Sequence, residues 1–128
     1  MRDIANNIGA VQAVAPAVLT ATNTSAAIDL LGFNSAAVII NTGAIAGSGN
    51  FTPKLQESDT TTSGDFTDVV AGDLVGTLPA ALVAASVYKV GYIGNKRYVR
   101  TVLTLNSGTS IAAGAVIVKG NAASKPVA

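Results

Sequence analysis

The sequence contains no cysteine and no histidine, and these two absences exclude several kinds of chemistry. Without cysteine there can be no disulfide bond, thiolate metal site or cysteine nucleophile. Without histidine the chain lacks the commonest general base, the Ser-His-Asp arrangement and the commonest transition-metal ligand. An enzyme built from this chain would have to use carboxylates, Lys, Ser or Tyr alone. The sequence therefore predicts a protein that is not an enzyme and uses no cofactor.

Aromatic and charged residues are both scarce, at 5% and 12% of the chain, and tryptophan is absent. The net charge of +1 lacks the basic excess that is typical of nucleic-acid binding proteins. No segment reaches the roughly 20 uninterrupted apolar residues that a membrane helix needs. The stretch 8–21 is the one signal-peptide candidate, and Gln12 and Pro16 interrupt it. We therefore expect neither nucleic acid nor a membrane as a partner.

Small side chains account for much of what is present. Hydrophobic residues make up 49% of the 128 residues, but 23 of them are alanine, and another 13 residues are glycine. A chain of this length suffices for one domain with one core. Because small side chains each bury little area, we expect the isolated protomer to be only modestly stable. This composition suits a subunit that completes its burial in an assembly.

Short runs of apolar and β-branched residues, separated by Gly, Asn, Ser and Asp, predict β-strands along most of the chain. The expected strands are residues 18–22, 26–31, 36–42, 51–58, 66–70, 87–93, 97–105 and 111–118. Seven or eight strands at roughly ten-residue spacing predict an all-β, single-domain β-sandwich or jelly roll. Residues 17–120 would form this domain, residues 1–16 an extended N-terminal arm, and residues 121–128 a C-terminal tail.

Three of these segments carry more specific signals. Residues 36–40 are apolar at every position, which predicts a central strand covered on both faces. In residues 51–56 apolar and polar side chains alternate, which predicts a strand with one buried face. Residues 87–93 and 97–105 flank Gly94-Asn95, two residues that tolerate a positive φ. We expect these two strands to form a hairpin.

Five of the seven acidic residues lie within 17 positions. They are Glu57, Asp59, Asp65, Asp68 and Asp73. Residues 59–65 resemble a calcium-binding loop with Gly at the sixth position, but Val70 stands where the bidentate Glu belongs. A glycosidase would need two such carboxylates in a sugar-binding cleft, and the few aromatic residues disfavour one. We expect a solvated loop without a metal ion.

Four of the eight basic residues, Lys89, Lys96, Arg97 and Arg100, fall in the expected hairpin among its three tyrosines. Mixed Arg and Tyr side chains are favoured at protein interfaces, although a solvated sheet face or base stacking would use the same residues. We predict one contact surface on the hairpin and another on the acidic segment; an ion pair within one subunit is equally compatible. The residues of the first are Tyr92, Lys96, Arg97, Tyr98 and Arg100, and those of the second are Asp59, Asp65 and Asp68.

Two sequence motifs resemble motifs of a known group of proteins. Residues 54–59 (KLQESD) followed by residues 66–69 (FTDV) are similar to a strand-loop-strand motif of phage structural proteins. Residues 90–100 (VGYIGNKRYVR) resemble a second and more specific motif of small phage and prophage proteins from head-region genes. The resemblance covers about residues 26–120. Members often end in a tail with His and Arg, whereas residues 121–128 contain neither.

The resemblance implies a structural protein of a tailed-phage particle, made in the bacterial cytoplasm. It favours a capsid decoration, or cement, protein on the outer surface of the phage head. Its partners would be the major capsid protein and further copies of itself, in a dimer or trimer. Alternatives are a tail, connector or head-fibre component in low copy number, or a carbohydrate-binding or adhesin module on the same sandwich.

Overall fold

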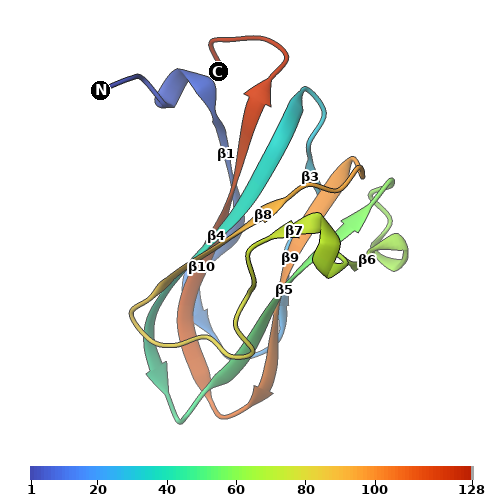
Figure 1. The fold of residues 1–128 in the computed structure, drawn as a ribbon. Coiled ribbons are helices and arrows are strands. Elements are labelled where there is room, and N and C mark those ends of the chain that lie inside the picture. Colours follow the sequence, from blue (N-terminus) through green and yellow to red (C-terminus); the bar gives the residue numbers. More distant parts are fainter. Residues whose placement is uncertain (128) are drawn as a thin grey trace.

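The computed structural model describes residues 1–127, which form two antiparallel β-sheets packed face to face (Figure 1). The predicted all-β sandwich is therefore confirmed. Ten strands are present, of which four are only two residues long. In the described residues, helical structure is limited to three single 3₁₀ turns, η1 (Ala5–Asn7), η2 (Ser63–Asp65) and η3 (Ala71–Asp73). Within residues 1–127 no helix is long and apolar enough to cross a membrane.

Sheet A has the strand order β1-β10-β4-β8-β7. Its strands are β1 (Gly9–Leu19), β10 (Ser110–Ala122), β4 (Phe33–Ala46), β8 (Val87–Tyr92) and β7 (Leu74–Val75). Sheet B has the order β2-β9-β5-β6, and β3 also pairs with β9. Its strands are β2 (Asn23–Thr24), β9 (Tyr98–Ser107), β5 (Asn50–Ser58), β6 (Thr67–Asp68) and β3 (Ile28–Asp29).

The core lies between the two sheets and consists mainly of aliphatic side chains. In β5 the predicted alternation is present, with Phe51, Pro53 and Leu55 buried and the side chains between them half-exposed. Phe51 of β5 and Leu103 of the neighbouring strand β9 are both fully buried. Because successive side chains of a strand point to opposite faces, this pattern orients the polar side chains of sheet B outward.

The strands β8 and β9 do not form the predicted hairpin. β8 pairs with β4 and β7 in sheet A, whereas β9 pairs with β5 in sheet B. The segment around Gly94-Asn95 therefore carries the chain from one sheet to the other. Residues suited to a tight turn also suit such a connection, so local sequence does not distinguish the two.

The N-terminal segment also differs from the expectation. The sequence predicts an arm over residues 1–16, but Gly9–Leu19 is a strand that pairs with β10 along most of its length. The register shifts between Gln12 and Val14 and again between Val14 and Ala17, which interrupts the regular alternation. This irregularity explains why the segment shows no clean period in the sequence.

A tight turn joins β9 to β10. Gly108 has a φ of +80°, which residues with a Cβ rarely adopt. A Cβ at this position would also meet the backbone carbonyl of Ser48, in the turn that joins β4 to β5. The two turns are further connected by a hydrogen bond of 3.2 Å from the Thr109 N–H to the Gly47 carbonyl.

Candidate interaction site

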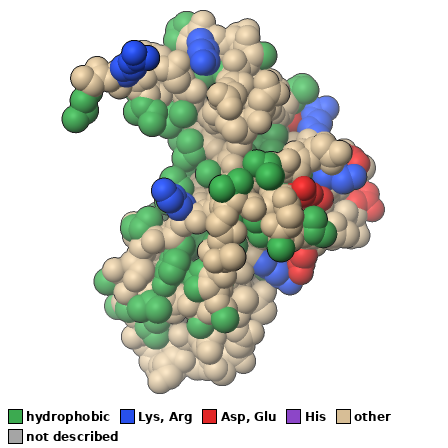
Figure 2. All heavy atoms as spheres, viewed as in Figure 1, with side chains coloured by type: hydrophobic (Ala, Val, Ile, Leu, Met, Phe, Trp, Pro, Cys, Tyr) green, Lys and Arg blue, Asp and Glu red, His purple; other side chains and the backbone are tan. Residues whose placement is uncertain are grey.

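The acidic segment and the basic residues of β9 lie next to each other because β5 pairs antiparallel with β9. The register places Ser58 opposite Tyr98 and Gln56 opposite Arg100. The acidic loop that follows β5 therefore begins beside the first residues of β9. Figure 2 shows the acidic side chains gathered on the side of the molecule that carries β6, with basic side chains among them. The contact surfaces predicted as two separate regions thus form one.

We call this group of side chains the charged cluster. It comprises Asp29, Lys54, Asp59, Asp65, Asp68, Lys96, Arg97 and Arg100.

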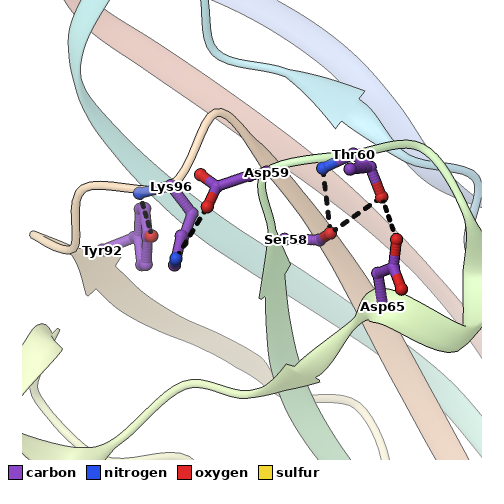
Figure 3. Close-up of polar contacts among 6 residues, drawn as sticks. All are labelled: Ser58, Asp59, Thr60, Asp65, Tyr92 and Lys96. Atoms are coloured by element: carbon purple, nitrogen blue, oxygen red, sulfur yellow. Dashed lines mark hydrogen bonds and ion pairs between the residues drawn. The ribbon is translucent and has the colours of Figure 1, made fainter.

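Lys96 connects the acidic loop to the connection between the sheets. Its ammonium group lies 2.7 Å from Oδ2 of Asp59 (Figure 3). This hydrogen-bonded ion pair raises the pKa of Lys96 above its ordinary value. The backbone N–H of Lys96 donates to the hydroxyl of Tyr92 at 3.0 Å. One residue is therefore attached both to the loop and to the core of the sandwich.

Hydroxyl groups fix the acidic loop itself (Figure 3). The backbone N–H of Thr60 donates to Oγ of Ser58 at 3.0 Å, and the Thr60 hydroxyl donates to Oδ2 of Asp65 at 2.6 Å. Asp65 is thus held by the loop, and it takes part in none of the ion pairs of residues 1–127. Among residues 1–127 no three acidic side chains stand together as metal ligands would.

Arg100 contacts three side chains on the outer face of sheet B. Its Nε donates to Oε1 of Gln56 at 2.7 Å, and one terminal nitrogen donates to Oγ of Ser63 at 2.9 Å. The guanidinium carbon lies 4.3 Å above the centre of the Phe66 ring. Gln56 donates in turn to Asp68 at 2.8 Å, and Lys54 lies 3.6 Å from the same carboxylate. These contacts join β5, β6 and β9 on the outer face of sheet B.

Arg97 forms a bidentate ion pair with Asp29, with Nε and a terminal nitrogen at 2.9 Å and 2.8 Å from the two carboxylate oxygens. The hydrogen bond from Arg97 lowers the pKa of Asp29 to about 2. The guanidinium also lies over the Tyr98 ring at 5.1 Å. Asp29 is 68 positions from Arg97, and only the pairing of β3 with β9 brings it opposite Tyr98. Nothing in the local sequence indicates this partner.

Tyr92 was predicted as a contact residue, and the structure shows that this is wrong. Its side chain points between the sheets and is 4% exposed. Burial, together with the neighbouring carboxylate of Glu57, raises the pKa of Tyr92 to about 12. Alternation along β8 places Val90 and Tyr92 on the same, inner face. Because β8 belongs to sheet A, this face is not shared with Lys96, Tyr98 and Arg100.

A shallow groove of about 540 Å³ lies beside the charged cluster. It is lined by residues 30–36, Asp59, Tyr92, residues 94–97 and Ala123. The side chains of Lys96 and Arg97 remain 38% and 46% exposed despite their ion pairs. Exposed ion pairs contribute little to stability, so these groups can exchange partners at a protein contact at small cost.

We predict that Asp29→Asn lowers the melting temperature by roughly 2–4 °C at neutral pH, because it removes one exposed, bidentate ion pair. The pKa of Asp29 is lower in the folded protein than its ordinary value of 3.8. The stabilisation by this ion pair is therefore present above pH 3.8 and is lost as the pH falls through about 2. Below that pH the wild type and Asp29→Asn should have the same melting temperature. Thermal melts over this range test the prediction, with Asp73→Asn, outside the charged cluster, as the control. Equal losses in the two variants would contradict it.

No protein-family model and no curated protein sequence matches the chain. Among solved structures it is similar to the SPBc2 prophage-derived protein YomS, with a TM-score of 0.55 and 13% sequence identity over 89% of this chain and 94% of the other. A structure of infectious bursal disease virus, Gx strain, matches with a TM-score of 0.45 and 12% identity. That match covers 93% of this chain but 33% of the viral chain, and it is too weak to indicate a shared fold. The chain therefore has the sandwich fold of a prophage-derived protein.

Proposed function

We propose that this chain is a structural protein of a tailed-phage particle that binds the outer capsid lattice as a decoration protein. The observation that carries the proposal is the exposed charged cluster on a sandwich with the same fold as a prophage-derived protein. The segments that resemble phage proteins, residues 54–59, 66–69 and 90–100, contain six of the eight residues of this cluster. The role requires no catalytic group, cofactor or metal ion.

The charged cluster supports docking on another protein because it carries both signs of charge close together. Lys96, Arg97 and Arg100 lie beside Asp29, Asp59 and Asp68, and most of these groups stay accessible to solvent. Such a surface gives a partner defined orientation more than strong affinity. Around a capsid lattice, many weak and equivalent contacts add up through multivalency. The contact would stabilise the shell by burying area between capsomers and the added subunit.

The proposal is tested by quantitative mass spectrometry of purified particles of the phage that encodes this chain. A copy number close to that of the major capsid protein is expected for a decoration protein. A small fraction of that number would instead indicate a tail, connector or head-fibre component. Absence from the particle would contradict any virion role and would favour a carbohydrate-binding or adhesin module.

Arg97→Ala combined with Arg100→Ala should weaken binding to undecorated capsids by about tenfold or more, because it removes two cations from the docking surface. Binding is measured by co-sedimentation of the purified chain with capsids. Arg2→Ala combined with Lys125→Ala is the matched control, since it removes the same charge from exposed positions outside the cluster. Circular dichroism checks that both proteins are folded. Equal binding by the two double variants would show that the cluster is not the docking surface.

A further inference from the structure

The outer face of sheet A is mostly apolar, in contrast to the outer face of sheet B, and it carries the exposed Lys89 on β8. The sequence predicts that residues 36–40 are covered on both faces, but the structure covers only one. Ala36, Val38 and Ile40 are buried against sheet B, whereas Ala37 and Ile39 are half-exposed on the other side. A strand that is apolar on both faces is typical of a sheet with a layer on each side. Residues 1–127 supply no second layer.

The neighbouring strand β10 shows the same pattern. Its side chains at 111, 113, 115 and 117 are buried in the core, and those facing outward are Ala112, Gly114, Val116 and Val118. The corresponding outward positions in sheet B include Lys54, Gln56 and Arg100. A sheet face that is solvated normally alternates apolar with polar residues, as sheet B does. The outward sequence of β10 and of residues 36–40 is therefore that of a buried face.

A groove of about 670 Å³ runs across this face, and none of the fifteen described residues that line it is charged. The strand register places Gln12, Val116, Ile39 and Lys89 in one row across the sheet, with Lys89 on β8 outside the lining of the groove. In the next outward row, Gly114 pairs with Asn41, and Asn41 pairs with Val87.

The groove has small residues in its floor and exposed side chains at its sides. Gly43, Ala112 and Gly114 line it, and Pro16 packs over Gly114, where a Cβ would lie 3.1 Å from the proline ring. Val18 on β1 and Val87 on β8 stand on opposite sides and are 66% and 68% exposed. A surface that presents both protruding valines and a floor of small residues can fit a second copy of itself about a two-fold axis.

The exposed area of the chain is consistent with an interface of this kind. Its accessible surface is 6964 Å², about 700 Å² more than the roughly 6,200 Å² typical of a monomeric protein of 12.7 kDa. The excess is close to the about 800 Å² that each partner buries in a standard interface. A second copy also accounts for the absence of charged residues from the described lining of the groove, since like charges on a self-facing surface would repel each other across the axis.

We propose that the outer face of sheet A is a homodimer interface, in which the sheets A of two copies pack face to face. The occupant of the groove is then the same face of a second copy, with Val18 and Val87 of each protomer inserted against the small residues of the other. The interface is separate from the charged cluster, which stays accessible in the dimer. The proposal does not depend on capsid binding, because the dimer would form from the purified chain alone.

Sedimentation equilibrium of the purified full chain over a dilution series tests the proposal. We expect a dimer of about twice the 12.7 kDa protomer mass, with dissociation in the micromolar range or tighter. Val18→Asp and Val87→Asp should each raise the dissociation constant by about 100-fold or more, because each would bury an unpaired carboxylate. Both side chains are exposed in the single chain, so the variants should keep the wild-type circular dichroism spectrum and unfolding curve of the monomer.

Val70→Asp is the matched control, since Val70 is 63% exposed and lies beside β6, away from the groove. It should leave the dissociation constant unchanged. A wild-type chain that remains monomeric at all concentrations would overturn the proposal and leave another protein, such as the capsid lattice, as the partner of this face. A dimer weakened equally by all three substitutions, or by none, would also overturn it.

Discussion

Phe51→Ala is expected to lower the free energy of unfolding by about 3–5 kcal/mol, the loss typical of a buried aromatic side chain. Phe51 has no exposed surface, and it belongs to the core between the sheets. Its carbonyl also accepts a hydrogen bond of 2.9 Å from Leu82, which attaches the long segment before β8 to sheet B. Because a domain of this size has only about 5–15 kcal/mol of stability, the variant should be close to unfolding.

Urea unfolding followed by circular dichroism measures this loss. Phe33→Ala is the control, because Phe33 lies half-exposed on β4 with the Lys119 ammonium 4.5 Å from its ring. Removing this ring should lower the free energy of unfolding by about 1 kcal/mol. Similar losses for the two variants would contradict the packing of Phe51 between the sheets.

Tyr92→Ala is expected to lower the free energy of unfolding by about 3–5 kcal/mol as well, because Tyr92 is a core residue rather than a contact residue. Tyr92→Phe should lower it by about 1 kcal/mol, since only the hydrogen bond with the Lys96 N–H is lost. Tyr98→Ala is the matched control on the outer face of sheet B. Its ring contacts Arg97, and its loss should lower the free energy of unfolding by about 1 kcal/mol or less.

The pH dependence of stability gives a second readout for Tyr92. Its pKa is raised from 10.0 to about 12 in the folded protein, so the neutral side chain stabilises the fold fully below pH 10. This contribution is lost as the pH rises from 10 through about 12, when the unfolded chain has already ionised. Urea unfolding in this range should show a smaller loss with rising pH for Tyr92→Phe than for the wild type. Identical pH profiles would indicate that the hydroxyl is not buried.

The residue pattern alone was sufficient to predict the fold class and several features of individual strands. Alternation over residues 51–56 correctly separated the inner from the outer side chains of β5, because the side-chain period of a strand is a local property. The continuous apolar run 36–40 correctly predicted a central strand, between β10 and β8, but the expected cover on both of its faces is wrong, because Ala37 and Ile39 are half-exposed. The absence of cysteine and histidine narrowed the possible chemistry, because it depends on composition and not on folding.

The same local signals could not identify the partners of each strand. Gly94-Asn95 suited a hairpin, yet β8 and β9 belong to different sheets, because strand pairing depends on contacts between distant segments. Because β8 belongs to sheet A, Tyr92 is buried between the sheets and does not share a face with the basic residues that are near it in the sequence. Likewise, the pairing of β3 with β9 brought Asp29 to Arg97, a contact between residues 68 positions apart.

The sequence by itself determined that the chain forms an all-β sandwich from small apolar residues, and that its charges are concentrated in two segments. Only the tertiary structure decided that these segments form one charged cluster and that one sheet leaves an apolar face uncovered. The physical reason is that alternation and composition are properties of neighbouring residues. The register between β5 and β9, and the layer that covers a sheet, depend on packing across the whole chain.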